Sequence, residues 1–294
     1  MKPGRKMMTV KMAVPNKGRL NERAVELLAK AGIDLGEDWG RRLCVCAGDQ
    51  GLEIMLVRAQ DIPAFISSGA IDIGITGEDM VAESGYDLKK MLDLEFGHCR
   101  LSVAAQEGSG VGSVDDIPDG ARIATSFPNL TEKFFKSQGK KVEIIEISGA
   151  AEIMPYLGVS DLICDLVATG STLETNRLVE VGKIIDTQAA VFTSDRALAS
   201  KRAEISDIVD SIKSVMSAEG RKYLMADVPK AKLADAQRIL PGIGGPTVLN
   251  IAGNDDMVAV HAVVDSKDVY RAVNDLKKIG AKGILTLSID RLVE

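Results

Sequence analysis

The sequence predicts an α/β protein with two successive layers of strands and helices, followed by a smaller terminal domain. Three observations lead to this prediction. Apolar strand-like runs alternate with helix-like stretches from the start of the chain, which is the pattern of an α/β layer. The same alternation begins again near Arg100. From about Lys222 the order becomes strand, helix, strand, strand, helix, strand, which is typical of a ferredoxin-like domain.

The first layer is predicted from apolar runs bounded by polar turns. The expected strands are residues 8–14, 44–47, 52–57 and 71–76. The expected helices are residues 20–31 and 61–68, which lie between or after these strands.

The second layer is predicted in the same way. The expected strands are residues 101–105, 121–125, 142–147 and 162–168, and helices are expected to begin near Asn129, Ala150 and Ser171, the last covering 173–181. Residues 182–193 are apolar and strand-like, and residues 202–217 carry apolar side chains at helical spacing, which indicates a return to the first layer. Two lobes joined by crossing strands would leave a cleft.

The terminal domain is predicted from a third set of elements. Its expected strands are 223–227, 247–251, 257–264 and 284–289, and its expected helices are 230–239 and 267–279. The Gly- and Pro-rich segment 240–247 supplies a flexible turn, and residues 253–256 resemble a hairpin. The fold alone does not establish what such a domain binds.

Composition narrows the possible functions. The 294 residues are 46% hydrophobic, enough for more than one core, and the net charge of -6 argues against nucleic-acid binding through a basic face. The basic first residues lack a signal peptide's apolar stretch, and no run is long enough to span a membrane, so a cytoplasmic protein is expected. The cysteines at 44, 46, 99 and 164 form no C-x-x-C pair and are expected to be reduced, and two histidines are too few for a His-rich metal site.

The segment from Asp161 to Leu173 carries the most functional information. An apolar run containing Asp165 is expected to form a buried strand, and Thr169-Gly170-Ser171-Thr172 then opens a helix. Free N–H groups at a helix start, with the helix dipole, can cradle a phosphate. Asp165 could accept hydrogen bonds from sugar hydroxyls, so the segment suits a sugar phosphate. The alternative is an ordinary N-capped helix after a core strand.

A longer set of residues resembles a known family. Its members at matching spacing are Glu152, Gly158, Ser160, Ile163, Asp165, Leu166, Thr169, Gly170, Thr172 and Leu173. This spacing is similar to the signature of the ATP phosphoribosyltransferases, which catalyse the first step of histidine biosynthesis. Further similarity lies in residues 14–20, 56–63, 72–79 and 99–101, and the last third of the chain resembles the long form of the family.

The resemblance implies a fold and a domain organisation. It implies a two-lobed core similar to periplasmic binding proteins, with lobe I formed by residues 1–97 and 183–217 and lobe II, which contains the phosphoribosyl-binding loop, by residues 98–182. Residues 218–294 would form a ferredoxin-like regulatory domain.

The resemblance also implies a reaction. The phosphoribosyl group of phosphoribosyl pyrophosphate would pass to N1 of the adenine of ATP, and pyrophosphate would leave. Mg²⁺ would be carried largely by substrate oxygens and waters, so no protein metal cage is required. Common phosphoribosyltransferases of the Rossmann-like type place two adjacent acids before the phosphate loop, whereas Asp165 is followed here by Leu166 and Val167.

For phosphoribosyl pyrophosphate, the candidate binding residues are Asp165 and residues 168–172, which are Ala168, Thr169, Gly170, Ser171 and Thr172. The candidate catalytic residues are Asp165, Glu152 and Arg19, and the two carboxylates would take the ribose hydroxyls. Glu152 has an alternative role, because a carboxylate at a helix start is favoured by the dipole.

For ATP, the candidate binding residues are Lys17, Arg19, Arg58, Asp72, Asp93 and Arg100. Cations that follow a strand would project from the sheet edge where ligands of open α/β sheets bind. The alternatives are solvated side chains for Lys17 and Arg19, pairing with a neighbouring acid for Arg58 and Arg100, an ordinary tight connection for Asp72, and a hinge for Asp93.

In the terminal domain, Asp227 and Thr247 match positions that contact the inhibitor histidine in the long-form family. The preceding Gly244-Gly245-Pro246 differs from the charged residue and serine of many relatives, and a helix cap and a turn are alternative roles. The resemblance implies a homo-oligomer, a dimer-based hexamer. The alternative from another class is a non-catalytic, two-lobed small-ligand binding or sensor protein.

Overall fold

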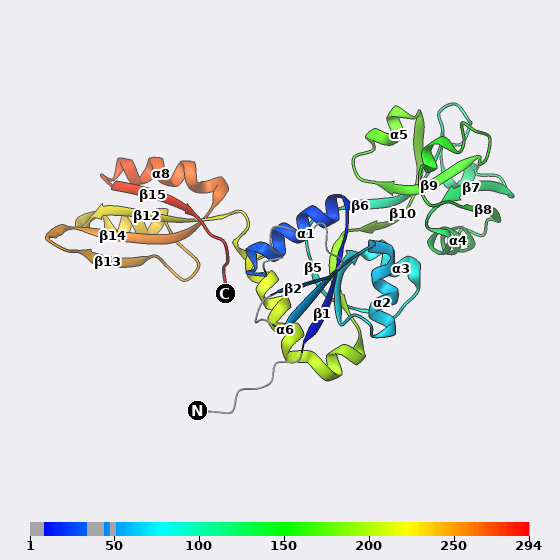
Figure 1. The fold of residues 1–294 in the computed structure, drawn as a ribbon. Helices are drawn as coiled ribbons and strands as arrows, with labels where there is room; N and C mark the ends of the chain where they lie inside the picture. Colours follow the sequence, from blue (N-terminus) through cyan, green and yellow to red (C-terminus); the bar gives the residue numbers. More distant parts are fainter. Residues whose placement is uncertain (1–8, 34–43, 48–50, 294) are drawn as a thin grey trace. The chain divides into compact units, whose positions relative to one another are not determined.

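The computed structural model describes residues 9–33, 44–47 and 51–293, with backbone only for 44–47 (Figure 1). The start of the strand expected at 8–14 and the side chains of Cys44 and Cys46 lie outside the described part. Contacts divide the chain into one unit that ends at Val209 and a second that runs from Asp210, with residues 30–32 joining the second. The two units are described separately.

Lobe I is built on sheet A. Its strands are β1 (Val10–Pro15), β2 (Cys44–Ala47), β3 (Leu52–Val57), β4 (Ile73–Gly77), β5 (Lys89–Asp93) and β11 (Ala189–Thr193), in the order β2-β3-β1-β4-β11-β5. Its helices are α1 (Gly18–Lys30), α2 (Ile62–Ser68) and α3 (Glu78–Ser84), with a 3-10 turn at Ala59–Asp61. β1 is parallel to β3 and β4, whereas β11 is antiparallel to β4 and β5. Ile62 and Ile66 of α2 are buried against Ala13 and Phe192 of the sheet.

Lobe II is built on sheet B. Its strands are β6 (Cys99–Gln106), β7 (Ala121–Thr125), β8 (Val142–Glu146), β9 (Leu162–Val167) and β10 (Leu178–Thr187), in the order β10-β6-β9-β7-β8. Its helices are α4 (Pro128–Ser137) and α5 (Ser171–Thr175), with 3-10 turns at Val114–Asp116 and Ala151–Ile153, the latter labelled η5. Phe127 and Phe135 are buried against Leu101 and Leu162 on one face of the sheet.

Both lobes repeat one strand order. The order β3-β1-β4-β11-β5 in sheet A corresponds to β8-β7-β9-β6-β10 in sheet B. In each sheet the antiparallel strand, β11 or β6, is the first strand after the chain crosses from the other lobe. This doubled arrangement is the periplasmic-binding-protein-like core, so the predicted fold class is confirmed.

The crossing points differ in part from the expected boundaries. The chain enters sheet B at Cys99, close to the expected residue 98. It leaves later than residue 183, because β10 remains paired with β6 as far as Thr187, which lies opposite Cys99. The single apolar run 182–193 therefore contributes to two strands in two sheets, and only the pairing partners separate them.

Two expected helices are much shorter than predicted. The helix expected at 173–181 ends at Thr175, since Arg177 takes a left-handed φ of 52° and strand β10 begins at the next residue, Leu178. The helix expected near Ala150 is the single turn η5, because Ala150 is itself left-handed and Pro155 follows closely. The elements α3 and β5 were not predicted at all.

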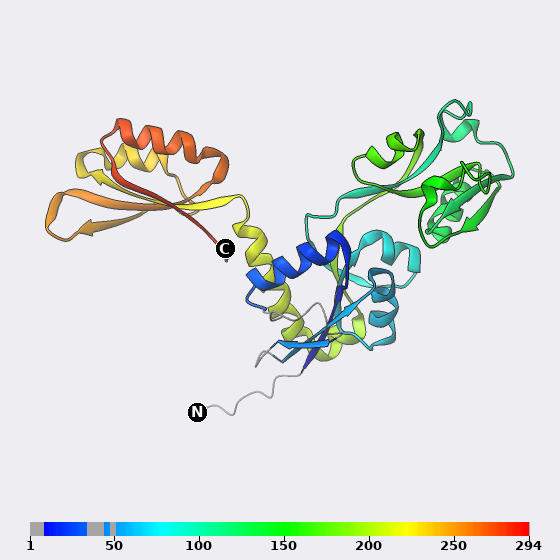
Figure 2. The same cartoon turned by 45° about the horizontal axis from the view of Figure 1, so that its top comes forward.

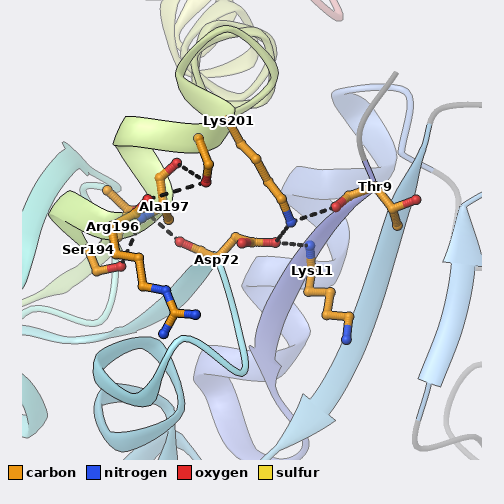
Figure 3. A network of polar contacts seen from close by, with 9 residues as sticks. Thr9, Lys11, Asp72, Ser194, Arg196, Ala197 and Lys201 are labelled. Carbon is orange, nitrogen blue, oxygen red and sulfur yellow. Dashed lines mark hydrogen bonds and ion pairs between the residues drawn. The ribbon is translucent and has the colours of Figure 1, made fainter. Parts of the chain in front are cut away.

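Helix α6 (Asp195–Ala218) extends the predicted helix and is interrupted at Lys201, whose φ of −135° is not helical. Figure 3 shows why this break is well anchored. Lys201 Nζ lies 2.7 Å from Asp72 Oδ2 and donates to the carbonyl of Thr9 at 2.8 Å. The same Asp72 oxygen accepts the backbone N–H of Lys11 at 2.7 Å. The break in α6 is thus tied to the start of β1.

The terminal domain contains β12 (Arg221–Pro229), β13 (Thr247–Ile251), β14 (Asn254–Asp265) and β15 (Lys282–Ser288), with α7 (Leu233–Ile239), α8 (Val269–Lys278) and 3-10 turns at Lys230–Lys232 and Ser266–Asp268. The antiparallel order β13-β14-β12-β15 is ferredoxin-like, as predicted. Figure 2 shows both helices on one face of the sheet, where Leu224, Val260, Ala236 and Leu276 are buried.

Among the described residues, no helix is both long enough and apolar enough to cross a membrane.

Candidate active site

The face of sheet B that carries Asp165 also carries the turn after β9. Side chains alternate along a strand, so Ile163, Asp165 and Val167 share one face. Ile163 and Val167 pack in a small core with Ala151 of η5 and Leu173 of α5. This core positions η5 and α5 beside Asp165.

The predicted carboxylates Asp165 and Glu152 are brought together by this packing. Burial raises the pKa of Asp165 above its ordinary value, a hydrogen bond from the Leu166 N–H at 2.7 Å opposes that shift, and the negative charge of Glu152 raises the pKa further. A partly buried carboxyl near a second carboxyl is an arrangement often found at functional sites.

The turn at residues 168–172 is open to solvent. Gly170 has a φ of 89°, a conformation that favours glycine, and a Cβ at this position would meet no atom within 4 Å. The hydroxyls of Thr169 and Ser171 lie 3.1 Å apart, and Ala168, Thr169, Ser171 and Thr172 are exposed. In a helix that begins at Ser171, the first N–H groups have no acceptor within the helix. The Ser171 N–H donates to Thr169 Oγ1 at 3.4 Å, and the exposed turn presents its hydroxyls and the Thr172 N–H to solvent.

Arg100 lies on this same face rather than with the other predicted ATP residues. It stands opposite Val167 in the β6–β9 pairing, and its Nη1 lies 3.5 Å from the carbonyl of Ala168. Its guanidinium pairs with Glu180 of β10, with Nη2 2.6 Å from Oε2. The expected alternative, pairing with an acid, thus occurs. Glu180 was missed by sequence reasoning because its place beside Arg100 depends on the non-local pairing of β10 with β6.

The cations Lys17, Arg19 and Arg58 lie at one edge of sheet A. β1 and β3 are parallel with Pro15 opposite Val57, and the N–H of Asn16 donates to the Val57 carbonyl at 2.8 Å. The residues that follow both strands therefore meet at the carboxyl edge. All three side chains are exposed, and within residues 9–33, 44–47 and 51–293 none of them pairs with an acid.

Asp93 lies at the end of β5 on that same edge. Its partner in β11, Ala190, also faces Thr76 near the end of β4. Lys90 Nζ forms an ion pair with Asp93 Oδ1 at 2.8 Å and donates a hydrogen bond to Glu78 at 2.7 Å, and these two acidic partners raise the pKa of Lys90 to about 12. Asp93 is thus already engaged with a cation of its own strand.

Asp72 is not brought to this edge. It precedes β4, so it lies at the opposite end of the sheet from Lys17 and Arg58, in the network with Lys201 and Lys11 (Figure 3). The prediction that Asp72 binds ATP therefore has no support in the geometry. The physical reason is that β4 begins after Asp72 and ends at Gly77, so Asp72 marks the start of the strand.

Asp227 and Thr247 share one face of the terminal sheet. Asp227 alternates with Tyr223 and Met225 on the face opposite the helices, and Met225 and Thr247 both lie opposite His261. Thr247 is exposed, and His261 Nδ1 lies 3.1 Å from the Tyr223 hydroxyl.

No group of three or more His, Cys, Asp or Glu side chains suited to a metal ion occurs among the described residues. Cys99 and Cys164 are free thiols in that part of the chain.

Comparisons with known proteins agree with this architecture. Residues 58–214 match the ATP phosphoribosyltransferase family profile, and residues 218–291 match the profile of the HisG C-terminal domain. The chain is 41% identical over 286 residues to an ATP phosphoribosyltransferase of Methanococcus maripaludis, an alignment that covers 96% of this chain and 99% of that one. It is 45% identical over 287 residues to the ATP phosphoribosyltransferase of Methanopyrus kandleri, covering 98% and 100%.

A solved structure is also similar. The ATP phosphoribosyl transferase (HisG:HisZ) complex from Thermotoga maritima matches with a TM-score of 0.65 and 30% identity, over 72% of this chain and 100% of that chain.

The fold and the comparisons together define a two-lobed α/β enzyme, a pentosyltransferase, with an appended ferredoxin-like domain. The chain belongs to the ATP phosphoribosyltransferase family. The predicted resemblance is confirmed, and an enzyme is favoured over a non-catalytic binding protein.

Proposed function

We propose that the protein transfers the phosphoribosyl group of phosphoribosyl pyrophosphate to N1 of the adenine of ATP and releases pyrophosphate, the first step of histidine biosynthesis. The observation that carries this proposal is the juxtaposition of Asp165 and Glu152 beside the open turn 168–172 on one face of sheet B. Family membership supports the choice of substrates.

On the phosphoribosyl side, the turn binds the 5′-phosphate. Its donors are the first N–H groups of α5 and the hydroxyls of Thr169, Ser171 and Thr172, and Gly170 lets the backbone approach the ligand closely. The Asp165 and Glu152 carboxylates accept hydrogen bonds from the ribose hydroxyls. Ionised acceptors on those hydroxyls also favour the positive charge that develops on the sugar as pyrophosphate leaves.

On the ATP side, Lys17, Arg19 and Arg58 bind phosphate oxygens at the carboxyl edge of sheet A. Their exposure and the lack of acidic partners within the described residues support this role. Asp93 lies at the same edge of sheet A as these cations and contacts the purine. Arg19 also helps to orient the adenine for attack.

The reaction requires little acid–base chemistry from the protein. The N1 lone pair of adenine attacks the anomeric carbon, the bond from that carbon to the pyrophosphate oxygen breaks, and a proton leaves N6 for a carboxylate or for pyrophosphate. Positioning and electrostatics supply most of the rate. When bound, Mg²⁺ would supply charge neutralisation for the leaving pyrophosphate and would be held mainly by substrate oxygens; Asp165 and Glu152 are the carboxylates of this site that could join it.

The test is direct assay of the purified protein with Mg²⁺, ATP and phosphoribosyl pyrophosphate. We expect phosphoribosyl-ATP and pyrophosphate in equal amounts. A lack of product across a range of salt and pH, with both compounds shown to bind by calorimetry, would leave only a binding protein.

We further propose that histidine inhibits the enzyme through the terminal domain. Asp227 would meet its α-amino group and Thr247 would donate from its hydroxyl, and their shared sheet face supports this pairing. Asp227→Asn should weaken histidine inhibition while activity without histidine is unchanged. Equal inhibition of both proteins would remove Asp227 from the site.

A homo-oligomer, a dimer-based hexamer, is proposed on the family resemblance alone, and light scattering of the purified protein tests it. A cytoplasmic enzyme is likewise our inference.

A further inference from the structure

Glu180 is a carboxylate that the proposed mechanism does not use, although it lies beside the phosphate turn. It accepts hydrogen bonds from Arg100 Nε at 2.8 and 3.0 Å and from Arg100 Nη2 at 2.6 Å. Ser102 Oγ donates to its Oε1 at 2.8 Å. A guanidinium held at two nitrogens by one carboxylate has a fixed orientation. The cluster is only partly buried, with 32% of the Arg100 side chain and 27% of the Glu180 side chain exposed, so a ligand can reach it.

The orientation directs the remaining donors of Arg100 toward the turn. Glu180 takes Nε and Nη2, and Nη1 lies 3.5 Å from the Ala168 carbonyl, at the first residue of the turn. Arg100 and Ser102 alternate on β6 and lie opposite Val167 and Asp165, so the cluster shares the face of the proposed phosphoribosyl site.

Asp165 is a second carboxylate within reach of Arg100. Arg100 is a diagonal neighbour of Asp165 across the β6–β9 pair, at a Cα separation of roughly 7–8 Å that an arginine side chain can bridge. Without Glu180, the guanidinium could pair with Asp165 and block the carboxylate that we assign to the ribose. The Glu180 fork offers the guanidinium an alternative partner.

We propose that Glu180 is a positioning residue that holds Arg100 at the phosphoribosyl pyrophosphate site, and that Arg100 binds a phosphate of this substrate rather than of ATP. The inference rests on the proposed function. The proposed role of Arg100 differs from the sequence-based prediction, which placed Arg100 among the ATP-binding residues.

The test compares Glu180→Gln with a matched control, Asp161→Asn. Asp161 forms the same kind of fork with Arg122, at 2.8 and 3.3 Å, in the same lobe but before β9 and away from the turn. For Glu180→Gln we expect the KM for phosphoribosyl pyrophosphate to rise about 10- to 100-fold, as for a lost charged hydrogen bond, and the KM for ATP to stay within about twofold. Asp161→Asn should leave both KM values within about twofold.

A double-mutant cycle separates positioning from a general loss of packing. If Glu180 acts through Arg100, then Glu180→Gln in an Arg100→Gln background should change the KM for phosphoribosyl pyrophosphate by less than about twofold. Additive effects, an equal rise in both KM values, or a rise for ATP alone would overturn the proposal.

Binding measurements test the role of Glu180 separately from the proposed phosphoribosyl transfer. Calorimetry of phosphoribosyl pyrophosphate with wild type and Glu180→Gln reports positioning even if no phosphoribosyl-ATP forms. Unchanged affinity in the variant would overturn the role of Glu180, whereas absent turnover in wild type would count against the proposed reaction only.

Discussion

The negative charge of an ionised Asp165 is only partly stabilised by its surroundings in the fold. Burial and the charge of Glu152 raise its pKa, and within the described residues only the Leu166 N–H donates a hydrogen bond to it. A raised pKa means that the folded protein disfavours the ionised form. The cost to stability is fully present above the folded-state pKa, shrinks as the pH falls from that value toward the pKa of the unfolded chain, and is absent below it.

Asp165→Asn should therefore lower activity and raise stability. We expect kcat to fall on the order of 10²-fold, as when one electrostatic contact to a transition state is removed. At neutral pH the variant should melt at a higher temperature than wild type, with the gain shrinking as the pH is lowered through the acid range. Activity assays and thermal melts over a pH series measure both effects.

Asp161→Asn is the control for the predicted rise in melting temperature, because the same kind of substitution should here lower it. Hydrogen bonds from Arg122 lower the pKa of Asp161, so its ionised form favours folding and the variant should melt lower at neutral pH. An Asp165→Asn protein with near-normal kcat would remove Asp165 from the site, and a lower melting temperature would show that its charge is compensated after all.

Asp72 offers the opposite case, a carboxylate with a structural role. Its side chain is 13% exposed and that of Lys201 is 17% exposed, and a mostly buried pair leaves a costly unpaired charge when one partner is removed. Asp72→Asn should lower the free energy of unfolding by about 2 kcal/mol and leave the KM for ATP unchanged. Urea unfolding and steady-state kinetics test this. A raised KM for ATP would restore Asp72 to the ATP site.

At the scale of elements, α3 of lobe I caps α4 of lobe II. The α4 N-cap, Phe127, has no capping side chain, and Glu83 of α3 accepts the N–H groups of Asn129 at 2.8 Å and Leu130 at 2.9 Å. The Asn129 side chain returns a hydrogen bond to the Glu83 carbonyl at 3.0 Å. A carboxylate at a helix N-terminus also interacts favourably with the dipole. One glutamate thus stabilises a helix in the neighbouring lobe.

Glu83→Gln should cost about 1–2 kcal/mol of stability, the usual range for a lost cap. The control is Glu132→Gln, which removes the exposed pair with Lys136 within α4 and should cost about 0.5 kcal/mol or less. Urea unfolding of both variants gives the comparison. Equal, small losses would mean that the cap contributes little.

At the scale of the whole molecule, the chain has separate cores. Each lobe and the terminal domain bury their own set of apolar side chains, including Phe192 in lobe I, Phe135 in lobe II and Leu276 in the terminal domain. Contacts within each of the two units support independent units of unfolding.

Scanning calorimetry should therefore resolve more than one unfolding transition. Phosphoribosyl pyrophosphate should raise the transition of the first unit, by an amount equivalent to about 2.7 kcal/mol at a ligand concentration of 100 times Kd, and leave that of the terminal domain in place. A single transition with equal calorimetric and van't Hoff enthalpies would show one cooperative unit instead.

Much of the fold could be predicted from local patterns. Strands such as 52–57 and 121–125 and the ferredoxin-like order were predicted correctly because apolar periodicity and turn residues are local signals. The secondary-structure predictions were wrong where strand pairing with a distant part of the chain decides the conformation. The stretch 178–187 looked partly helical, yet its pairing with β6 makes it a strand.

The same limit applies to the candidate site. Asp72 and Asp165 each stand four residues before a Thr-Gly pair. Strand β4 runs from Ile73 to Gly77, so it includes the Thr-Gly pair and begins just after Asp72. Strand β9 runs from Leu162 to Val167, so it includes Asp165 and ends before the Thr-Gly pair. The same spacing between an acid and a Thr-Gly pair thus places one acid before its strand and the other near the carboxyl end of its strand.

The sequence by itself determined the family, the layered α/β class, the glycine turn and the acids near it, because these depend on residue type and short-range spacing. Tertiary structure alone decided that Arg100 lies beside that turn, that Glu180 orients it, and that Asp72 pairs with Lys201. The physical reason is that strand register and chain crossing bring together residues far apart in the chain, and their contacts are set by the packing of whole sheets.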